Sequence, residues 1–382
     1  MFNNFVRFVQ EMYSTTELIP LHAPQFNGNE KKYLLEAIDS TFVSSTGEFV
    51  DKFEHRVAEY TGVKYAIATV NGTAALHIVL QLSGVREDTE VITQSLTFVA
   101  TCNAIYYCNA KPIFIDVDKE TLGLSPVSLK AFLEEYGELR NDGCCWNKKS
   151  NKKIAACLPM HTFGFPVQLQ EIKKICDDYN IELVEDAAEA LGSLYKNKHV
   201  GMFGKISAIS FNGNKIITSG GGGMILTNSK ELAIRAKHLT TTAKIAHRWN
   251  FEHDEIGYNY RLPNLNAALG VAQMEELPER LTSKRIIAQH YQKWGDDYGL
   301  KFMREPHETR SNYWLNVALT QDKQQRDIML EVTNKHGIMT RPAWSPMHKL
   351  RMNNGCQRDE LINTLWIYER VVNVPSSAHF KN

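Results

Sequence analysis

Three short stretches of this sequence carry residues that could hold and react with a small charged molecule. Asp186 directly follows residues 181–185, an apolar run that predicts a buried strand. The carboxylate would therefore lie in the crevice beyond the strand end, where ligands bind in open α/β sheets. A buried carboxylate without a partner is costly, so Asp186 needs a ligand or a counter-charge. Taken alone, it could also simply cap the helix that follows.

The second stretch is NGTAALH (71–77), which joins a predicted strand to an amphipathic helix. Gly72 lets the backbone approach a ligand closely, and Thr73 and Ala74 would present N–H groups at the positive end of the helix. Such a helix start suits a phosphate group. An ordinary capped helix with no ligand is the alternative interpretation.

The third stretch contains Lys215, which follows a predicted strand at 206–211 and precedes four glycines at 220–223. Burial can lower the pKa of such a lysine, and a neutral amine can form a Schiff base. The G-x-x-x-x-G-K-[ST] spacing of a P-loop is absent. A surface lysine before a flexible turn is the alternative.

Together, the three stretches describe one cofactor. Pyridoxal 5′-phosphate (PLP) needs a helix start for its phosphate, a carboxylate for its pyridinium nitrogen and a lysine for its imine. We therefore predict PLP as the cofactor, with Lys215 and Asp186 as catalytic residues.

The elements that must position these residues alternate between short apolar strands and helical patterns. This alternation predicts an α/β fold with a large, mainly parallel sheet of about seven strands and helices on both faces. The sequence grows richer in charge after a predicted helix at 265–274, with one further strand at 313–319. We expect a large cofactor-binding domain over 1–274 and a smaller C-terminal α+β domain over 275–382. Strands are expected at 65–69, 90–93, 112–117, 154–159, 181–185, 206–211 and 224–227, and a polar surface loop at 143–153.

Composition narrows the class of protein. The chain has 382 residues, of which 43% are hydrophobic, so it can bury a large core. Lysine plus arginine and aspartate plus glutamate both number 43, so a basic surface for nucleic acid is not expected. Seven scattered cysteines without a CxxC pair indicate reduced thiols rather than a zinc site. Residues 91–110 are uncharged but too polar to span a membrane. We expect a cytoplasmic protein, and we expect no bound metal.

From about residue 19 to near its end, the chain resembles the DegT/DnrJ/EryC1/StrS family of fold-type-I PLP-dependent sugar aminotransferases. The HDEIGYNYRLPN, RSNYWLN and MTRPAW runs are most similar to the LegC-type branch, which acts on nucleotide-linked 4-keto-6-deoxy-N-acetylhexosamines. The family motifs occur in order as NGTAALH (71–77), QSLTFVATCNA (94–104), MHTFG (160–164), VEDAAEALGS (184–193), SFNGNKIITSGGGGM (210–224) and GYNYRLPNLNAALG (257–270).

The resemblance implies a role for each matching position. Lys215 would carry PLP as an imine and move a proton, while Asp186 would keep the pyridine nitrogen protonated. Phe98 would stack on the cofactor ring. The implied phosphate contacts are Thr73, Ala74, Ser210 and, from a neighbouring subunit, Asn259, so two subunits of a homodimer would share each active site.

Glu189 departs from the glutamine that many family members have beside the phenolic oxygen of PLP, and this exchange favours amination at carbon 4. Contacts to the substrate are expected from His161, Arg261, Tyr313 and Arg341, with Trp344 and His348 as further candidates.

The resemblance implies transfer of an amino group from L-glutamate to carbon 4 of a nucleotide-linked 4-keto-6-deoxy sugar, with pyridoxamine 5′-phosphate formed between the two half-reactions. The first expectation is a UDP-2-acetamido-2,6-dideoxy-4-ketohexose of the legionaminic acid or bacillosamine type, used in lipopolysaccharide biosynthesis. A perosamine-type enzyme acting on GDP-4-keto-6-deoxymannose is the alternative. A PLP-dependent sugar dehydratase would have histidine in place of Lys215. A non-catalytic regulator on the same scaffold and a plain nucleotide-binding module are the remaining alternatives.

Overall fold

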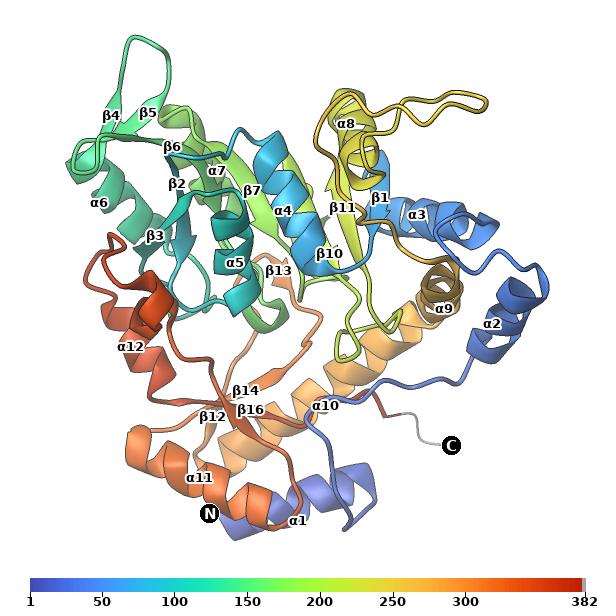
Figure 1. Cartoon of the computed structure of the whole chain (residues 1–382). Helices are drawn as coiled ribbons and strands as arrows, with labels where there is room; N and C mark the ends of the chain where they lie inside the picture. The colour runs from blue at the N-terminus through green and yellow to red at the C-terminus, as the bar shows by residue number, and fades with distance from the viewer. Residues whose placement is uncertain (380–382) are drawn as a thin grey trace.

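The computed structural model describes residues 1–379 and contains a large sheet flanked by helices and a smaller antiparallel sheet (Figure 1). The main path through the large sheet is β1-β11-β10-β7-β6-β2-β3, in which β11 runs antiparallel to β1 and β10 and the other neighbours are parallel. The predicted, mainly parallel α/β sheet is therefore confirmed. The strands are β1 (Tyr65–Thr69), β2 (Thr89–Gln94), β3 (Lys111–Ile115), β6 (Lys152–Leu158), β7 (Glu182–Asp186), β10 (Ile206–Ser210) and β11 (Gly223–Thr227).

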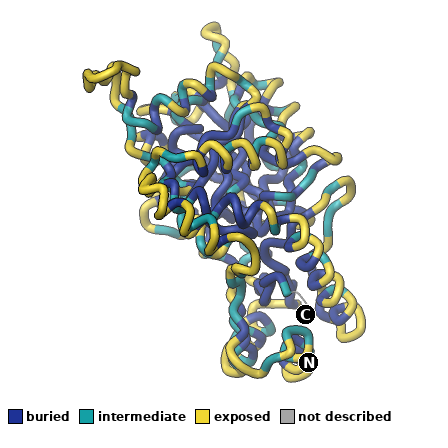
Figure 2. Tube along the Cα trace, turned by 90° about the vertical axis from the view of Figure 1, so that its right-hand side faces the viewer, coloured by how far each residue is buried: buried dark blue, intermediate teal, exposed yellow. Residues whose placement is uncertain are grey.

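Helices cover both faces of this sheet, which is why its strands are apolar on both sides. One face packs against α4 (Gly72–Leu82), α5 (Val99–Tyr107) and α8 (Lys230–Thr240). The other packs against α3 (Glu48–Thr61), α6 (Pro126–Tyr136), α7 (Leu169–Asp178) and α9 (Asn264–Glu275), while α2 (Glu30–Asp39) lies beside α9. Figure 2 shows the buried trace through the middle of the molecule, enclosed by exposed segments.

The smaller sheet has the order β12-β14-β16-β15 and is antiparallel throughout. Its core also takes in the first helix of the chain, since Phe5 and Val9 pack with Tyr291 and Trp294. The division into domains at 274/275 stays a prediction. The elements are α1 (Phe2–Tyr13), α10 (Leu277–Tyr298), β12 (Lys301–Phe302), β14 (Asn316–Leu319), α11 (Lys323–Lys335), β15 (Arg341–Pro342), α12 (Ile362–Tyr368) and β16 (Val371–Val374).

The predicted surface loop at 143–153 is wrong in part, because this segment contains β5 (Cys145–Asn147) and the start of β6. β5 pairs with β4 (Gly137–Leu139) and with β6. Cys145 is fully buried, and the Asn147 side-chain amide donates to the buried Glu90 carboxylate at 2.8 Å. Two inward-facing side chains therefore anchor a segment whose charges suggested a free loop.

Among residues 1–379, no helix is both long and apolar enough to cross a bilayer.

Candidate active site

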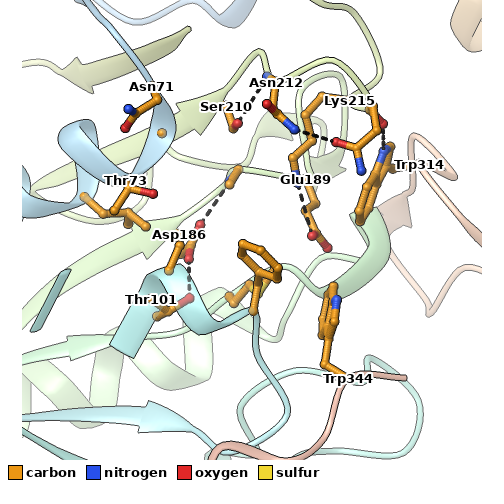
Figure 3. A pocket seen from close by; sticks show the side chains of 17 residues that line it. Asn71, Thr73, Thr101, Asp186, Glu189, Ser210, Asn212, Lys215, Trp314 and Trp344 are labelled. Atoms are coloured by element: carbon orange, nitrogen blue, oxygen red, sulfur yellow. Dashed lines mark hydrogen bonds and ion pairs between the residues drawn. The ribbon is translucent and has the colours of Figure 1, made fainter. Parts of the chain in front are cut away.

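A cavity of about 380 Å³ lies where β7 and β10 end and α4 begins (Figure 3). Because β7 and β10 are parallel neighbours, their carboxyl ends meet at the same edge of the sheet. Two tryptophans from the C-terminal part of the chain, Trp314 and Trp344, complete the wall. Seven of the candidate site residues named from the sequence line this one cavity: Thr73, Phe98, Asp186, Glu189, Ser210, Lys215 and Trp344.

The start of α4 forms one end of the cavity. Asn71 caps the helix, its side-chain oxygen accepting the Ala74 N–H at 2.7 Å. The Ala74 N–H that the sequence assigned to a phosphate is thus already bonded, which leaves Gly72 and Thr73 at the helix start. A Cβ atom on Gly72 would lie 2.9 Å from the Ser210 Cβ, so only glycine keeps this space open. The helix dipole and neutral donors gathered here suit an anion such as phosphate.

Asp186 lies deeper in the cavity, at the end of β7, with 2% of its surface exposed. Its carboxylate accepts hydrogen bonds from the Thr101 hydroxyl at 2.8 Å and the Ala188 N–H at 3.1 Å. Burial raises the pKa of Asp186, while the two hydrogen bonds and the charge of Lys215 partly oppose that rise. Neutral donors therefore orient the Asp186 carboxylate, but little positive charge balances it. The N–H group of a cationic ring could supply that charge.

Lys215 and Glu189 form an ion pair on the opposite side, with the amine 3.2 Å from the carboxylate Oε1. The side chain of Lys215 is 11% exposed and that of Glu189 is 1% exposed. Burial raises the pKa of Glu189 to about 7, even though Lys215 and a hydrogen bond from the Phe163 N–H favour the carboxylate. The Glu189 carboxyl group can therefore take up and release a proton near neutral pH.

His161 is fully buried but does not line the cavity. Its Nδ1 accepts the Val167 N–H at 3.3 Å, so its Nε2 carries the proton that faces Glu185 at 3.2 Å. Glu185 also accepts the N–H groups of Gly201, Phe203 and Gly204. In this structure, His161 belongs to a network behind the cavity wall.

The remaining predicted residues are not brought to the cavity of this chain. Asn259 is exposed and accepts hydrogen bonds from the Arg261 guanidinium at 3.0 and 3.2 Å. Tyr313 is buried, and its hydroxyl lies 3.3 Å from the Gln292 amide. Arg341 is exposed and donates to Asn334 at 2.9 Å. Their expected contacts with phosphate or substrate stay predictions.

PLP fits the donor set of this cavity. The helix start with Gly72 and Ser210 suits the phosphate, Asp186 suits the ring nitrogen, and the Lys215 amine suits the aldehyde. Within residues 1–379, no cation lies in hydrogen-bond contact with the buried Asp186 carboxylate, and a bound pyridinium would supply one.

Among the lining residues that the sequence does not single out, Thr101 and Trp314 contact the two candidate catalytic residues. Thr101 holds Asp186 and lies within the QSLTFVATCNA motif, four residues after Thr97, to which it bonds at 2.7 Å. Trp314 faces Lys215, whereas the sequence predicts a substrate contact from its neighbour Tyr313. The spacing of four residues between Thr97 and Thr101 indicates that their hydroxyl groups can meet. Nothing in the sequence indicates which of Tyr313 and Trp314 lines the cavity.

Comparisons with known proteins identify the family and the fold of this chain. A model of the DegT/DnrJ/EryC1/StrS aminotransferase family matches residues 24–382. GDP-perosamine synthase of Escherichia coli O157:H7 is 37% identical over 95% of this chain and 94% of its own. GDP-perosamine synthase of Vibrio cholerae is 36% identical over 88% of this chain and 87% of its own. Spr1654 of Streptococcus pneumoniae, solved in its PMP form, shares the fold with a TM-score of 0.84, at 19% identity and covering 96% of this chain and 94% of that one.

Proposed function

The chain belongs to the DegT/DnrJ/EryC1/StrS aminotransferase family, and from this premise we propose that it aminates carbon 4 of a nucleotide-linked 4-keto-6-deoxy sugar. It is an aminotransferase, and its cofactor is PLP. The relatives named GDP-perosamine synthases favour GDP-4-keto-6-deoxymannose as the substrate. Amination of that sugar at carbon 4 would give GDP-perosamine. The UDP-linked N-acetyl sugar and the LegC-type branch, expected first from the sequence, are the less supported reading.

The observation that carries this proposal is the Lys215 amine in the same cavity as the buried Asp186 carboxylate. PLP, when bound, supplies an electron sink that stabilises negative charge on the carbon bearing the nitrogen. The buried Asp186 carboxylate would hold a proton at the ring nitrogen and so keep that sink effective. Lys215 Nζ would take the proton from the carbon that bears the amino group and would deliver it to the cofactor carbon on the other side of that nitrogen, two bonds away. Retention of a lysine here also argues against the dehydratase alternative.

Glu189 gives Lys215 a nearby proton acceptor. The two side chains are 3.2 Å apart and nearly excluded from water, so a proton lost by the amine would pass to this carboxylate more readily than to solvent. The pKa of Glu189, raised to about 7, lies in the range where the carboxyl group can both take up and release that proton. Glutamine could not do this.

We propose L-glutamate as the amino donor and a homodimer as the working form. Asn259 is exposed, Arg261 is half-buried, and neither lines the cavity of its own chain, which leaves both available to contribute to a neighbouring subunit. On the preceding stretch of chain, Trp249, Phe251 and Ile256 are 69%, 81% and 83% exposed, and a subunit interface would cover these large apolar side chains.

The test is to incubate the purified protein with L-glutamate and either GDP-4-keto-6-deoxymannose or the UDP-linked 4-keto N-acetyl sugar, and to identify the products by mass spectrometry and NMR. We expect amination at carbon 4, with the GDP-linked sugar preferred by at least about tenfold in kcat/KM. Lys215→Ala is the control and should give no product. Preference for the UDP-linked sugar would overturn the proposed substrate. PLP binding without turnover of any keto sugar would favour a non-catalytic regulator.

A further inference from the structure

The indole of Trp314 lies against the reactive lysine. The Lys215 Nζ atom is 4.1 Å from the centroid of this ring. The indole N–H donates to the Asn214 carbonyl at 2.6 Å (Figure 3). One side chain therefore covers the amine and also holds the backbone of the residue immediately before it.

Trp314 is itself fixed from several sides, with 4% of its surface exposed. Its backbone N–H donates to the Asn312 side-chain oxygen at 2.8 Å. Its carbonyl accepts the amine of Lys284 at 3.2 Å, and Lys284 is fully enclosed on α10. Because Trp314 is already immobilised, its contacts with Lys215 and Asn214 cost little further conformational entropy.

The same stretch of chain also reaches the other partner of Lys215. The Asn312 side-chain amide donates to the Glu189 carbonyl at 2.8 Å and to the Leu191 carbonyl at 2.9 Å. Residues 312–314 therefore hold the segment that carries Glu189 and the segment that carries Lys215. Both sides of the Lys215–Glu189 pair depend on one short segment that leads into β14.

We propose that Trp314 is a positioning residue, which fixes the Lys215 amine for imine formation and links the C-terminal part of the chain to the reactive lysine. This inference rests on the role of Lys215 proposed above. The indole face attracts the ammonium form and restricts the amine to one side of the cavity. The bond to the Asn214 carbonyl fixes the turn from which the lysine side chain extends.

Trp344 provides a matched control. It lines the same cavity, but its ring packs against Phe98 and Phe163, with centroids 5.9 and 4.9 Å away. Its indole N–H has no partner among the hydrogen bonds of the described part of the chain. Substitution of Trp344 removes a comparable aromatic surface without touching the Lys215 turn.

The experiment compares Trp314→Phe, Trp314→Leu and Trp344→Leu with the wild type. In cofactor-free protein, brief reductive methylation followed by peptide mass spectrometry measures how accessible each lysine amine is. Addition of PLP then gives the rate constant for growth of the imine absorbance band. Lys284, which is 1% exposed, serves as an internal monitor of unfolding.

We expect Trp314→Leu to speed methylation of Lys215 by at least about threefold and to slow imine formation by about tenfold, the range expected for loss of a cation–π contact and a hydrogen bond. Trp314→Phe keeps an aromatic face but loses the indole N–H, so it should fall between Trp314→Leu and the wild type. Trp344→Leu should leave methylation of Lys215 within about twofold, because the Trp344 ring packs against Phe98 and Phe163 and not against Lys215. In Trp314→Leu, faster methylation of Lys215 together with slower imine formation would show that Trp314 positions the amine.

Two results would overturn the inference. One is that both Trp314 variants keep methylation and imine formation at Lys215 within about twofold of the wild type. The other is that methylation of Lys284 rises in parallel with that of Lys215, since this would indicate general loosening. If the wild type formed no imine at Lys215, the proposed function would fail, while the methylation result would still test the contact between Trp314 and Lys215.

Discussion

Replacement of Glu189 by glutamine should make the cofactor-free protein more stable at high pH. The carboxylate is 1% exposed, its Oε1 lies 3.2 Å from the Lys215 amine, and its Oε2 accepts the Phe163 N–H at 2.9 Å. Burial nevertheless dominates and raises the pKa of Glu189 to about 7 from 4.5. The folded protein therefore holds a proton that the unfolded chain has already lost.

The sign and size of the effect follow from this difference. With a folded pKa above the unfolded value, ionisation costs stability as pH rises from 4.5 towards 7, and the full cost is present above 7. The difference of 7 − 4.5 = 2.5, at 1.36 kcal/mol for each unit, corresponds to about 3.4 kcal/mol. Over the accessible window from pH 5 to pH 8.5, the change amounts to about 2.5 kcal/mol. Glutamine does not titrate, so Glu189→Gln avoids this cost.

Urea unfolding of cofactor-free protein at pH 5 and pH 8.5, at one protein concentration, measures the effect. The difference in free energy of unfolding between Glu189→Gln and the wild type should shift in favour of the variant by about 2.5 kcal/mol over that range. The exposed Glu231 offers a control, and Glu231→Gln should show no such shift. A difference for Glu189→Gln that did not change with pH, or that moved towards the wild type at pH 8.5, would refute the reasoning. It would mean that the ion pair with Lys215 outweighs the burial of the carboxylate.

Two further substitutions test the ends of the cavity. Thr101→Val removes the hydroxyl that donates to Asp186 at 2.8 Å, so kcat/KM should fall about ten- to hundredfold, with little change in the melting temperature. A fall below twofold would show that this bond does not orient the carboxylate. Gly72→Ala places a Cβ atom 2.9 Å from that of Ser210, and the Kd for PLP should rise at least about tenfold by equilibrium dialysis. Gly213→Ala, where a Cβ atom meets nothing within 4 Å, is its control, and equal affinities in both variants would argue against phosphate at this helix start.

The sheet and half of the site could be predicted because they depend on local patterns. The predicted strands coincide with the observed ones to within a few residues, since continuous apolar runs are required wherever both faces of a strand are covered. Once the strands were placed, Asp186 and Ser210 had to lie at the same edge of the sheet, beside the helix that starts at Gly72. Parallel pairing alone brings these residues together.

The other half of the site depends on long-range packing. Tyr313 has a φ of +47°, and nothing in the sequence indicates this left-handed backbone, which sends Tyr313 into the core while Trp314 lines the cavity. His161 fits a family motif, yet its ring bonds to Glu185 behind the cavity wall. The packing of α1 against the C-terminal elements likewise has no local signal.

The central claim is that Lys215 is the residue that binds PLP covalently, and borohydride reduction tests it most directly. The purified holoenzyme would be reduced, digested and analysed by mass spectrometry. We predict loss of the visible absorbance band and a phosphopyridoxyl group on the peptide that contains Lys215, with no such label in Lys215→Ala. A label on another lysine, or retention of the absorbance band by Lys215→Ala, would contradict the account.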